Sequence, residues 1–333
     1  MRRQRGVALL VVMLILTIMM VVAANISTRF QMQLIRTANL VMLEQGKWYA
    51  IASEALVTKV LQQDIQDSPE RTHLAQYWAS SQQVFPVEGG TLKGVIRDAQ
   101  GCYNLNAINS GTQGADPTVL PYAADVFKHL LMNLKVEEFE ALQITDALRD
   151  WVDSNDEMVS STGAEDAWYQ SLKVPYLAAN APMSDVSELR LVKGVTPTIY
   201  RRLLPMVCAL PTLSNAQEMQ INVNTLRRCQ LPLISAIFVG QMSAEDAIEL
   251  LQKRPRDGWI GVDAFLSEPK VMNAMAAAGL NQTVLKKNFS VNSYYFESQL
   301  EVSMDETSLH YISLFKRTGN KVNVIRRQNG GSE

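Results

Sequence analysis

An apolar run near the N-terminus constrains this chain more than any other feature. Between Val7 and Ala24 the only polar side chain is that of Thr17, and three arginines precede the run. At about 1.5 Å per residue, a helix of this length extends over about 27 Å, close to the ~30 Å of a bilayer's hydrocarbon core. We therefore predict a transmembrane helix over residues 7–24. The arginines predict that the N-terminus stays in the cytoplasm and that the remainder lies outside it.

The apolar run does not end as a secretory signal peptide would. Such a signal has a shorter apolar region, followed by a cleavage site and a break in the pattern. Here apolar residues continue at spacings of three and four as far as Ile65, and no proline occurs before Pro69. The pattern predicts one helix over residues 7–65, half of it in the membrane, with Gly46 as the candidate site of a bend. A single-span anchor with a helical stalk is the plain alternative.

The start of the chain resembles the leader of type IV pilins and type II secretion pseudopilins, in which basic residues and a glycine precede a long apolar helix. The resemblance implies that a prepilin peptidase cuts between Gly6 and Val7 and that the new amine of Val7 is methylated. The fifth residue after the cut is usually Glu in the family, and here it is Val11. That Glu is thought to pair with a neighbouring subunit, since an unpaired charge among packed helices is costly. Its absence implies a subunit at the end of a fibre.

Several internal stretches resemble the minor pseudopilin K family of type II secretion systems. They lie between residues 101 and 259 and are GCYNLNAIN, ITDALRDWVDSNDE, TGAEDAWY, DVSELRLVKGV, INVNTL and RPRDGW. Together with the leader, the resemblance covers nearly the whole chain. It implies an α+β pseudopilin fold, in which a long N-terminal helix packs on a small antiparallel sheet and a large all-α domain is inserted in the sheet region.

The patterning of the chain predicts the same division into parts. Strand-like runs rich in β-branched and aromatic residues occupy both sides of a helical middle, and the motifs NLNA and NVNT within it resemble each other. Each motif leads into a helical segment, which predicts two helical subdomains. The expected parts are a leader at 1–6, the N-terminal helix at 7–65, the first part of the sheet at 66–103, an inserted α-domain at 104–288 with subdomains at about 104–220 and 221–288, the second part of the sheet at 289–327 and a disordered tail at 328–333.

An acidic segment is the candidate binding site. Ten acidic residues lie between residues 137 and 166, and Arg149 is the one basic residue among them. Composition alone leaves a flexible acidic surface loop and a metal site as equal alternatives. The stretch DSNDE, from Asp153 to Glu157, alternates oxygen ligands as calcium loops do, but an EF-hand requires Gly where this chain has Met158.

The family resemblance favours the metal, because the pseudopilin K family binds calcium in this region. Calcium takes six to eight oxygen ligands, and mutually repelling carboxylates disfavour the fold when no cation is present. The helix dipole adds to this at Asp150, which we place at a helix C-terminus. We expect a structural role, since no nucleophile or general base accompanies the acids. The expected calcium ligands are Asp150, Asp153, Asn155, Glu165 and Asp166, with Asp156 in reserve.

The three cysteines are too few for a disulfide scaffold. Cys102 precedes the inserted domain and Cys208 follows its first half, so we favour a disulfide between these two. In the chain-entropy model a loop of this length contributes about 4–5 kcal/mol. A disulfide between Cys208 and Cys229 is the alternative, and three free thiols are the other.

The stretch SELRLVKGVTPTIYRRLLP resembles a helix-hairpin-helix, a motif that some DNA-binding proteins use. Those versions carry Gly-x-Gly in the hairpin, and here the second glycine is Thr196. The net charge of −2 also lacks the basic excess of nucleic-acid binders. We interpret the hairpin as a packing motif, with a membrane-anchored DNA receptor as the alternative. Since the sequence has none of the common hydrolase, phosphate-loop or dinucleotide motifs, we expect no enzyme activity. A metal-dependent hydrolase, the third alternative, would also need an open coordination position and a base.

The expected function is that of a minor pseudopilin of type II secretion, which caps the pseudopilus tip and starts its assembly for protein export across the outer membrane. The protein would be a single-pass inner-membrane protein with a periplasmic C-terminal domain. Its bulky α-domain would obstruct any subunit stacked above it. The resemblance implies as partners the minor pseudopilins I and J, then H and the major pseudopilin, and the prepilin peptidase. The expected cofactor is structural calcium, and we expect no nucleic acid.

Overall fold

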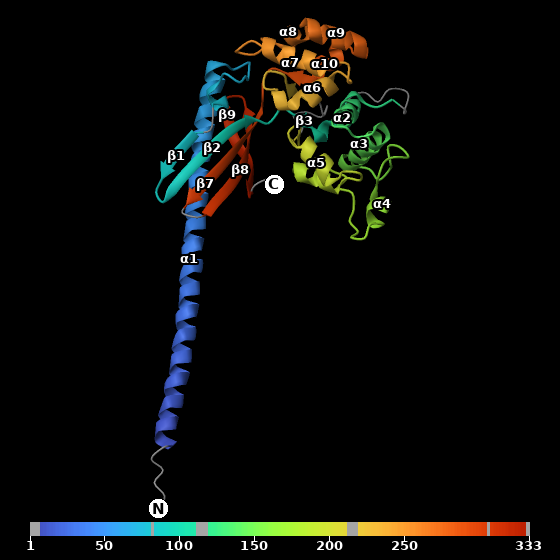
Figure 1. Ribbon diagram of the computed structural model, residues 1–333. Helices are drawn as coiled ribbons and strands as arrows, with labels where there is room; N and C mark the ends of the chain where they lie inside the picture. Colours follow the sequence, from blue (N-terminus) through green and yellow to red (C-terminus); the bar gives the residue numbers. More distant parts are fainter. Residues whose placement is uncertain (1–6, 81–82, 111–118, 212–218, 305–306, 331–333) are drawn as a thin grey trace, which may run out of the picture.

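The chain is described by a computed structural model over residues 7–80, 83–110, 119–211, 219–304 and 307–330. Helix α1 (Val7–Asp67) begins at the residue that follows the expected leader cut, and its N-terminal half projects freely from the rest (Figure 1). All its side chains from Val7 to Val41 are exposed. Among the described residues, α1 is the one helix long and apolar enough to cross a membrane. It is consistent with a single-pass anchor.

Gly46, the candidate site of a bend, does not interrupt helix α1. The helix continues through Gly46, which is buried against strand β8 (Thr307–Thr318). A Cβ atom at this position would lie 2.4 Å from Cδ1 of Leu309. The glycine therefore allows the helix to approach the sheet closely.

A five-stranded antiparallel sheet packs on the C-terminal half of α1, in the order β1-β2-β7-β8-β9. The remaining strands of this sheet are β1 (Gln83–Val87), β2 (Gly90–Asp98), β7 (Tyr295–Met304) and β9 (Lys321–Asn329). Strand β2 pairs with β7 along its whole length, so that Asp98 lies opposite Phe296. The chain thus leaves the sheet after Asp98 and returns beside the same point. Everything between is an insertion, which confirms the α+β pseudopilin fold.

The two faces of the sheet have different partners. Phe296 and Phe315 point toward α1 and pack in one cluster with Leu61 of that helix. On the same side, the Arg327 guanidinium donates to both carboxylate oxygens of Glu54 on α1, each at 2.8 Å. Because strand side chains alternate between faces, the residues between these point away from α1. That second face looks toward the inserted domain.

The insertion is mainly helical. Its helices are α2 (Tyr122–Asn133), α3 (Glu138–Val152), α4 (Asp166–Gln170), α5 (Pro197–Leu203), α6 (Leu231–Ile237), α7 (Ala244–Lys253), α8 (Val262–Leu266), α9 (Pro269–Ala278) and α10 (Gln282–Asn288). Short 3₁₀ helices in it are η2 (Leu105–Ala107), η3 (Val186–Leu191) and η4 (Arg228–Gln230), while η1 (Tyr77–Ala79) lies before β1. In Figure 1 the helices α2 to α5 form one group, and α6 to α10 lie farthest from the N-terminus.

Two short parallel pairings divide the insertion. Strand β3 (Tyr103–Asn104) pairs with β4 (Val207–Cys208), and β5 (Ile221–Asn222) pairs with β6 (Phe289–Ser290). These pairings belong to the two similar motifs, and each closes one helical segment on itself. The two closed segments have about the bounds expected for the two helical subdomains, and their buried side chains share one hydrophobic core. Residues 289–290 belong to the second closure, and the sheet resumes only at residue 295.

The asparagines of the two motifs explain their likeness. The side chain of Asn106, the second asparagine of the first motif, accepts from the Met183 backbone N–H at 2.7 Å and donates to the Met183 carbonyl at 2.9 Å. The Asn224 side chain does the same to Trp259, at 2.8 and 3.1 Å. A buried side-chain amide can pair with a backbone donor and a backbone acceptor at once. It can therefore hold two chain segments together where no β-ladder forms between them.

Cys102 and Cys208 form a disulfide, as expected, and Cys229 is free and exposed. The disulfide lies beside the first closure and joins its two ends. At the other end of the chain, β9 extends to Asn329, so the disordered tail expected from residue 328 is wrong in its start. The Gln328 side chain donates to Oδ2 of Asp185 at 2.6 Å, which holds this end against the α-domain. Residues 331–333 of the expected tail lie outside the described residues.

Candidate metal centre

Helix α3 provides the base of the acidic loop. Its start is capped by Glu137, whose Oε2 accepts the backbone N–H of Phe139 at 2.9 Å and of Glu140 at 3.2 Å. One face of the helix is buried in the core of the α-domain, and this fixes the orientation of the other. Asp146 and Asp150 are four residues apart and so share a face. The loop between α3 and α4 folds back over that face.

Two carboxylates of α3 hold this loop. Oδ2 of Asp146 accepts hydrogen bonds from the hydroxyls of Ser160 at 2.6 Å and Thr162 at 2.5 Å. The two oxygens of Asp150 accept the backbone N–H groups of Val159 at 2.8 Å and Ala164 at 2.7 Å. The Asp150 carboxylate is therefore already anchored, and each oxygen keeps a free lone pair.

Gly163 is required where the loop passes Asp150. A Cβ atom on Gly163 would lie 2.1 Å from Oδ2 of Asp150, which is far inside van der Waals contact. Any larger residue would push the loop away from α3. The TGAED stretch thus needs its glycine for close approach to the carboxylate.

Glu165 is the exceptional member of the site. Only 6% of its surface is exposed, and neither carboxylate oxygen has a hydrogen-bond partner among the described residues. Burial, followed by the charges of Asp150 and Asp153, raises the pKa of Glu165 to about 7. Burial likewise raises the pKa of Asp150 to about 6, although its two backbone hydrogen bonds oppose this. An unpaired buried carboxylate costs several kcal/mol unless it is protonated or meets a cation.

The remaining expected ligands surround this pair less closely. Asp153 and Asn155 line a cleft of about 570 Å³ beside Arg149, and each side chain accepts a backbone N–H of the loop, from Asn155 at 3.3 Å and from Glu157 at 2.9 Å. Burial raises the pKa of Asp153.

Asp166 lies at the start of α4, where its Oδ1 accepts the Ala178 N–H at 2.9 Å. Oδ1 of the reserve residue Asp156 accepts from the Asn180 amide at 2.8 Å. In the part of the chain that the structure describes, no group of three His, Cys, Asp or Glu side chains is already arranged to hold a metal ion. The structure thus brings the acids onto one loop without making all of them converge.

Lys193 contacts the acidic loop, and the sequence interpretation did not connect the two. Its ammonium donates to the carbonyl oxygens of Thr162 at 3.2 Å and Gly163 at 2.9 Å, and it lies 5.6 Å from the centre of the Trp168 ring. Arg149 is therefore not the one cation beside the loop. The stretch LVKGV contained the signal, but a contact with a loop thirty residues earlier has no local pattern.

The hairpin that carries Lys193 packs within the molecule. Gly194 has a φ of 86°, and a Cβ atom there would lie 2.7 Å from Cγ1 of Ile144 on α3. The hairpin therefore rests on the same helix that bears Asp146 and Asp150. Its glycine serves a tight turn and close packing, which supports the interpretation as a packing motif.

Comparison with known proteins identifies relatives along the whole chain. Two family models, both described as type II secretion system (T2SS), protein K, match residues 101–212 and 221–292. These ranges coincide with the two closed subdomains. The type II secretion system protein K of Aeromonas hydrophila is 43% identical over 338 residues, covering 100% of this chain and 99% of that protein. The protein of the same description from Klebsiella pneumoniae is 41% identical over 329 residues, covering 98% and 97%.

A solved structure matches as well. It is described as the crystal structure of the GspK-GspI-GspJ complex from the type 2 secretion system of enterotoxigenic Escherichia coli. One chain of it superposes with a TM-score of 0.78 at 34% identity, covering 89% of this chain and 100% of that chain.

Proposed function

This chain belongs to the type II secretion system protein K family, and from that premise we propose that it is a minor pseudopilin that caps the tip of the pseudopilus and starts its assembly. The observation that carries the proposal is the sequence identity that this chain shares with protein K relatives over its full length. The named relatives are components of a secretion system, and the proposed role is structural and interactional. The chain would thereby support protein export across the outer membrane.

The shape of the molecule supports a terminal position. The inserted α-domain lies at the end opposite the N-terminus of α1, beyond and beside the sheet (Figure 1). A fibre of this class grows by stacking such helices, and a domain of this bulk would obstruct a subunit above it. Val11 supports the same position, because the chain lacks the carboxylate that would pair with a neighbouring subunit.

We propose maturation at the cytoplasmic side of the membrane. The prepilin peptidase would cut between Gly6 and Val7, and the amine of Val7 would be methylated. Gly6 lies outside the described residues, while Val7 is the first residue of α1. The helix would remain in the inner membrane with the sheet and α-domain in the periplasm. Mass spectrometry of the N-terminal peptide tests this, and a chain that retains residues 1–6 would contradict it.

The proposed partners are the minor pseudopilins I and J, and then H and the major pseudopilin. The matched structure is described as a complex of GspK with GspI and GspJ. In this chain, the part of α1 between the expected membrane span and the sheet exposes Phe30, Leu34 and Val41, which suits helix packing. Co-purification of the full chain with I and J in detergent tests the proposal. Failure to form a complex at any calcium concentration would contradict it.

We further propose that the acidic loop binds calcium as a structural ion. Hard oxygen donors suit calcium, and Glu165 supplies a buried carboxylate that has no hydrogen-bond partner in the described part of the chain. Asp150, Asp153, Asn155 and Asp166 would supply the others, after the more exposed side chains turn toward Glu165. When bound, the ion would neutralise the repelling acids and fix the loop on α3.

Isothermal calorimetry with calcium chloride tests the loop directly. We expect binding that is lost in Glu165→Gln and kept in Glu157→Gln, because Glu157 is exposed and outside the expected ligand set. Binding that survives the Glu165 substitution, or the absence of any heat, would contradict the calcium assignment without affecting the assignment to the tip.

A further inference from the structure

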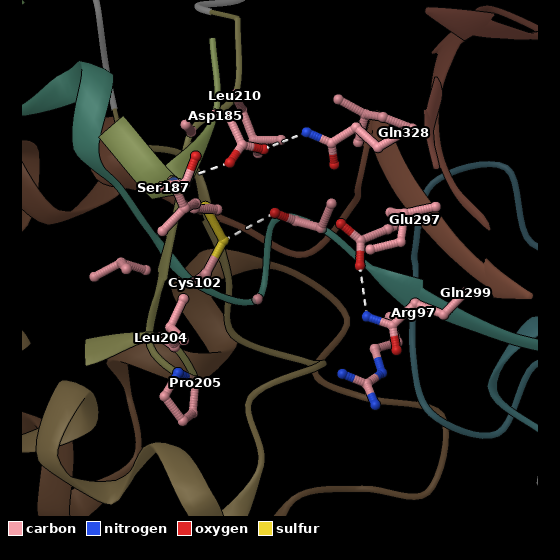
Figure 2. A pocket seen from close by; sticks show the side chains of 18 of the residues that line it. Arg97, Cys102, Asp185, Ser187, Leu204, Pro205, Leu210, Glu297, Gln299 and Gln328 are labelled. Atoms are coloured by element: carbon pink, nitrogen blue, oxygen red, sulfur yellow. Dashed lines mark hydrogen bonds between the residues drawn. A yellow bond between two sulfur atoms is a disulfide. The ribbon is translucent and has the colours of Figure 1, made fainter. Parts of the chain in front are cut away.

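A cleft of about 700 Å³ separates the sheet from the α-domain, on the sheet face that α1 leaves uncovered. One wall consists of alternate strand residues that point away from α1, among them Arg97, Glu297 and Arg326. The facing wall includes Ser187 and Leu204 of the α-domain together with the disulfide (Figure 2). Ligand sites commonly have volumes of about 300–1,000 Å³. The cleft is thus large enough for several residues of a bound chain.

Three of the four arginines of this cleft have no carboxylate partner among the described residues, whereas Arg326 donates to the Ser184 carbonyl and lies 3.9 Å from Asp185. Arg97 on β2, Arg190 on η3 and Arg227 before η4 all line it. No carboxylate of the described residues lies within ion-pair distance, 4.0 Å, of their guanidinium groups. Arg190 lies over the half-buried ring of Tyr200, at 5.8 Å from its centre, which leaves its N–H edges available. Three cationic groups from three separate elements therefore border one opening.

The acids of the cleft are already engaged. Asp185 accepts from the Ser187 N–H at 2.9 Å and from the Gln328 amide at 2.6 Å. Burial opposes ionisation of Asp185, but these hydrogen bonds outweigh it and lower its pKa. Glu297 accepts from the Gln299 amide at 2.9 Å.

Asp98 also borders the cleft, and its carboxylate accepts hydrogen bonds from the hydroxyls of Thr225 and Ser293. Four arginines and three acids line the cleft, so the net charge of its lining is positive.

We propose that this cleft binds an acidic segment of a partner protein in an extended conformation. A guanidinium group can donate two parallel hydrogen bonds to one carboxylate, so each arginine can hold one acidic side chain. Arginines on three elements suit several carboxylates along a chain better than a single small anion. Leu204, Pro205 and Leu314 provide apolar wall between them for the intervening residues. The proposal depends neither on the tip position nor on calcium.

Fluorescence anisotropy with the full chain in detergent tests this proposal. The probe is a labelled peptide in which Asp and Glu alternate with uncharged residues, and its control replaces them with Asn and Gln. We expect saturable binding of the acidic peptide that weakens as salt rises, and no binding of the control. Equal binding of the two peptides, or no binding of either, would overturn the proposal. Inorganic phosphate that displaces the peptide at equal concentration would reduce the cleft to a simple anion site and overturn it too.

Single substitutions locate the binding. Arg97→Gln and Arg190→Gln should each weaken binding of the acidic peptide about tenfold, because each removes one charge-assisted pair. Both side chains are exposed, so we expect unchanged melting temperatures. Arg201→Gln is the matched control, since Arg201 is an exposed arginine of α5 outside the cleft. An equal loss of affinity in Arg201→Gln would show nonspecific attraction and refute the assignment.

Discussion

Two carboxylates withdrawn from water are stabilised in opposite ways in this molecule. Asp98, at the end of β2, accepts hydrogen bonds from the hydroxyls of Thr225 and Ser293 and from the amide of Asn222. Glu165, in the acidic loop, accepts none from the described part of the chain. Burial raises the pKa of both groups. For Glu165 the neighbouring acids raise it further, whereas for Asp98 the hydrogen bonds oppose the shift.

The difference distinguishes a site whose hydrogen bonds all form on folding from a site that lacks a partner until a ligand binds. The donors around Asp98 come from the second closure and from the segment before β7, so they assemble whenever the insertion docks on the sheet. No described residue donates a hydrogen bond to Glu165, and the charges that raise its pKa are those of neighbouring acids. A cation from solution would supply the missing partner, which is why the two sites should respond differently to calcium.

Removal of the Asp98 carboxylate should have the largest effect. Asp98→Ala leaves the donors of Thr225, Ser293 and Asn222 unpaired, and we expect the free energy of unfolding to fall by about 3–5 kcal/mol. The loss should be equal in calcium and in EGTA. Urea unfolding of the full chain in detergent, followed by tryptophan fluorescence, measures it. Glu70→Ala, at an exposed site, is the control. A loss that calcium restores would erase the contrast between the two sites.

Glu165→Gln should act in opposite directions with and without calcium. In EGTA the substitution removes a repelled buried charge and should raise the free energy of unfolding at neutral pH by roughly 1–3 kcal/mol. In calcium it should abolish the stabilisation that the wild type gains. The same urea titrations in both buffers measure this. Destabilisation in EGTA would mean that Glu165 has an internal partner after all.

The pH dependence of the free energy of unfolding should also report on Glu165, with a smaller effect than the preceding substitutions. The folded pKa of about 7 exceeds the ordinary value of 4.5, so the folded state holds more protons than the unfolded state between these pH values. The contribution of Glu165 to stability in EGTA should therefore be fully present below about pH 4.5 and be lost as the pH rises through 7. In Glu165→Gln, the free energy of unfolding should decline by about 1–2 kcal/mol less over the same pH range. Calcium should reverse the slope, because its ligands must be ionised. Parallel curves for the two proteins in EGTA would contradict the raised pKa.

Lys193 offers the smallest effect. Lys193→Met removes hydrogen bonds to the carbonyls of Thr162 and Gly163, and we expect a loss of about 1 kcal/mol in EGTA. The loss should shrink in calcium, since the ion then carries the positive charge of the loop. Melting temperatures in the two buffers measure it, with Lys173→Met at an exposed site as control. A larger loss in calcium than in EGTA would show that Lys193 and the ion do not share this role.

The parts of the fold with a repeating pattern could be predicted from the sequence. The apolar run and its spacing gave α1, and alternation and turn residues indicated the strands on both sides of the insertion. Strand-like runs on both sides of a helical middle predicted the insertion, and the family resemblance implied the same architecture. The close packing at Gly46 could not be predicted, because it depends on Leu309 of β8, which is distant in the sequence.

The candidate site could be predicted in its composition and only partly in its geometry. Consecutive acids indicate a loop that binds cations, but nothing local shows that Glu165 is buried and Asn155 exposed. Lys193 and Asp98 were missed because their partners lie on other elements. Their roles appear only when the hairpin rests on α3 and the second closure docks on the sheet.

Hydrogen exchange of backbone amides, with and without calcium, tests the central claim most directly. Val159 and Ala164 donate to Asp150 in the loop, and Gln100 donates to Asp98 at the junction. We predict that calcium slows exchange of the two loop amides markedly and leaves Gln100 unchanged. Equal rates in the loop with and without calcium, or equal slowing at all three positions, would contradict the claim that only the Glu165 site requires an external cation.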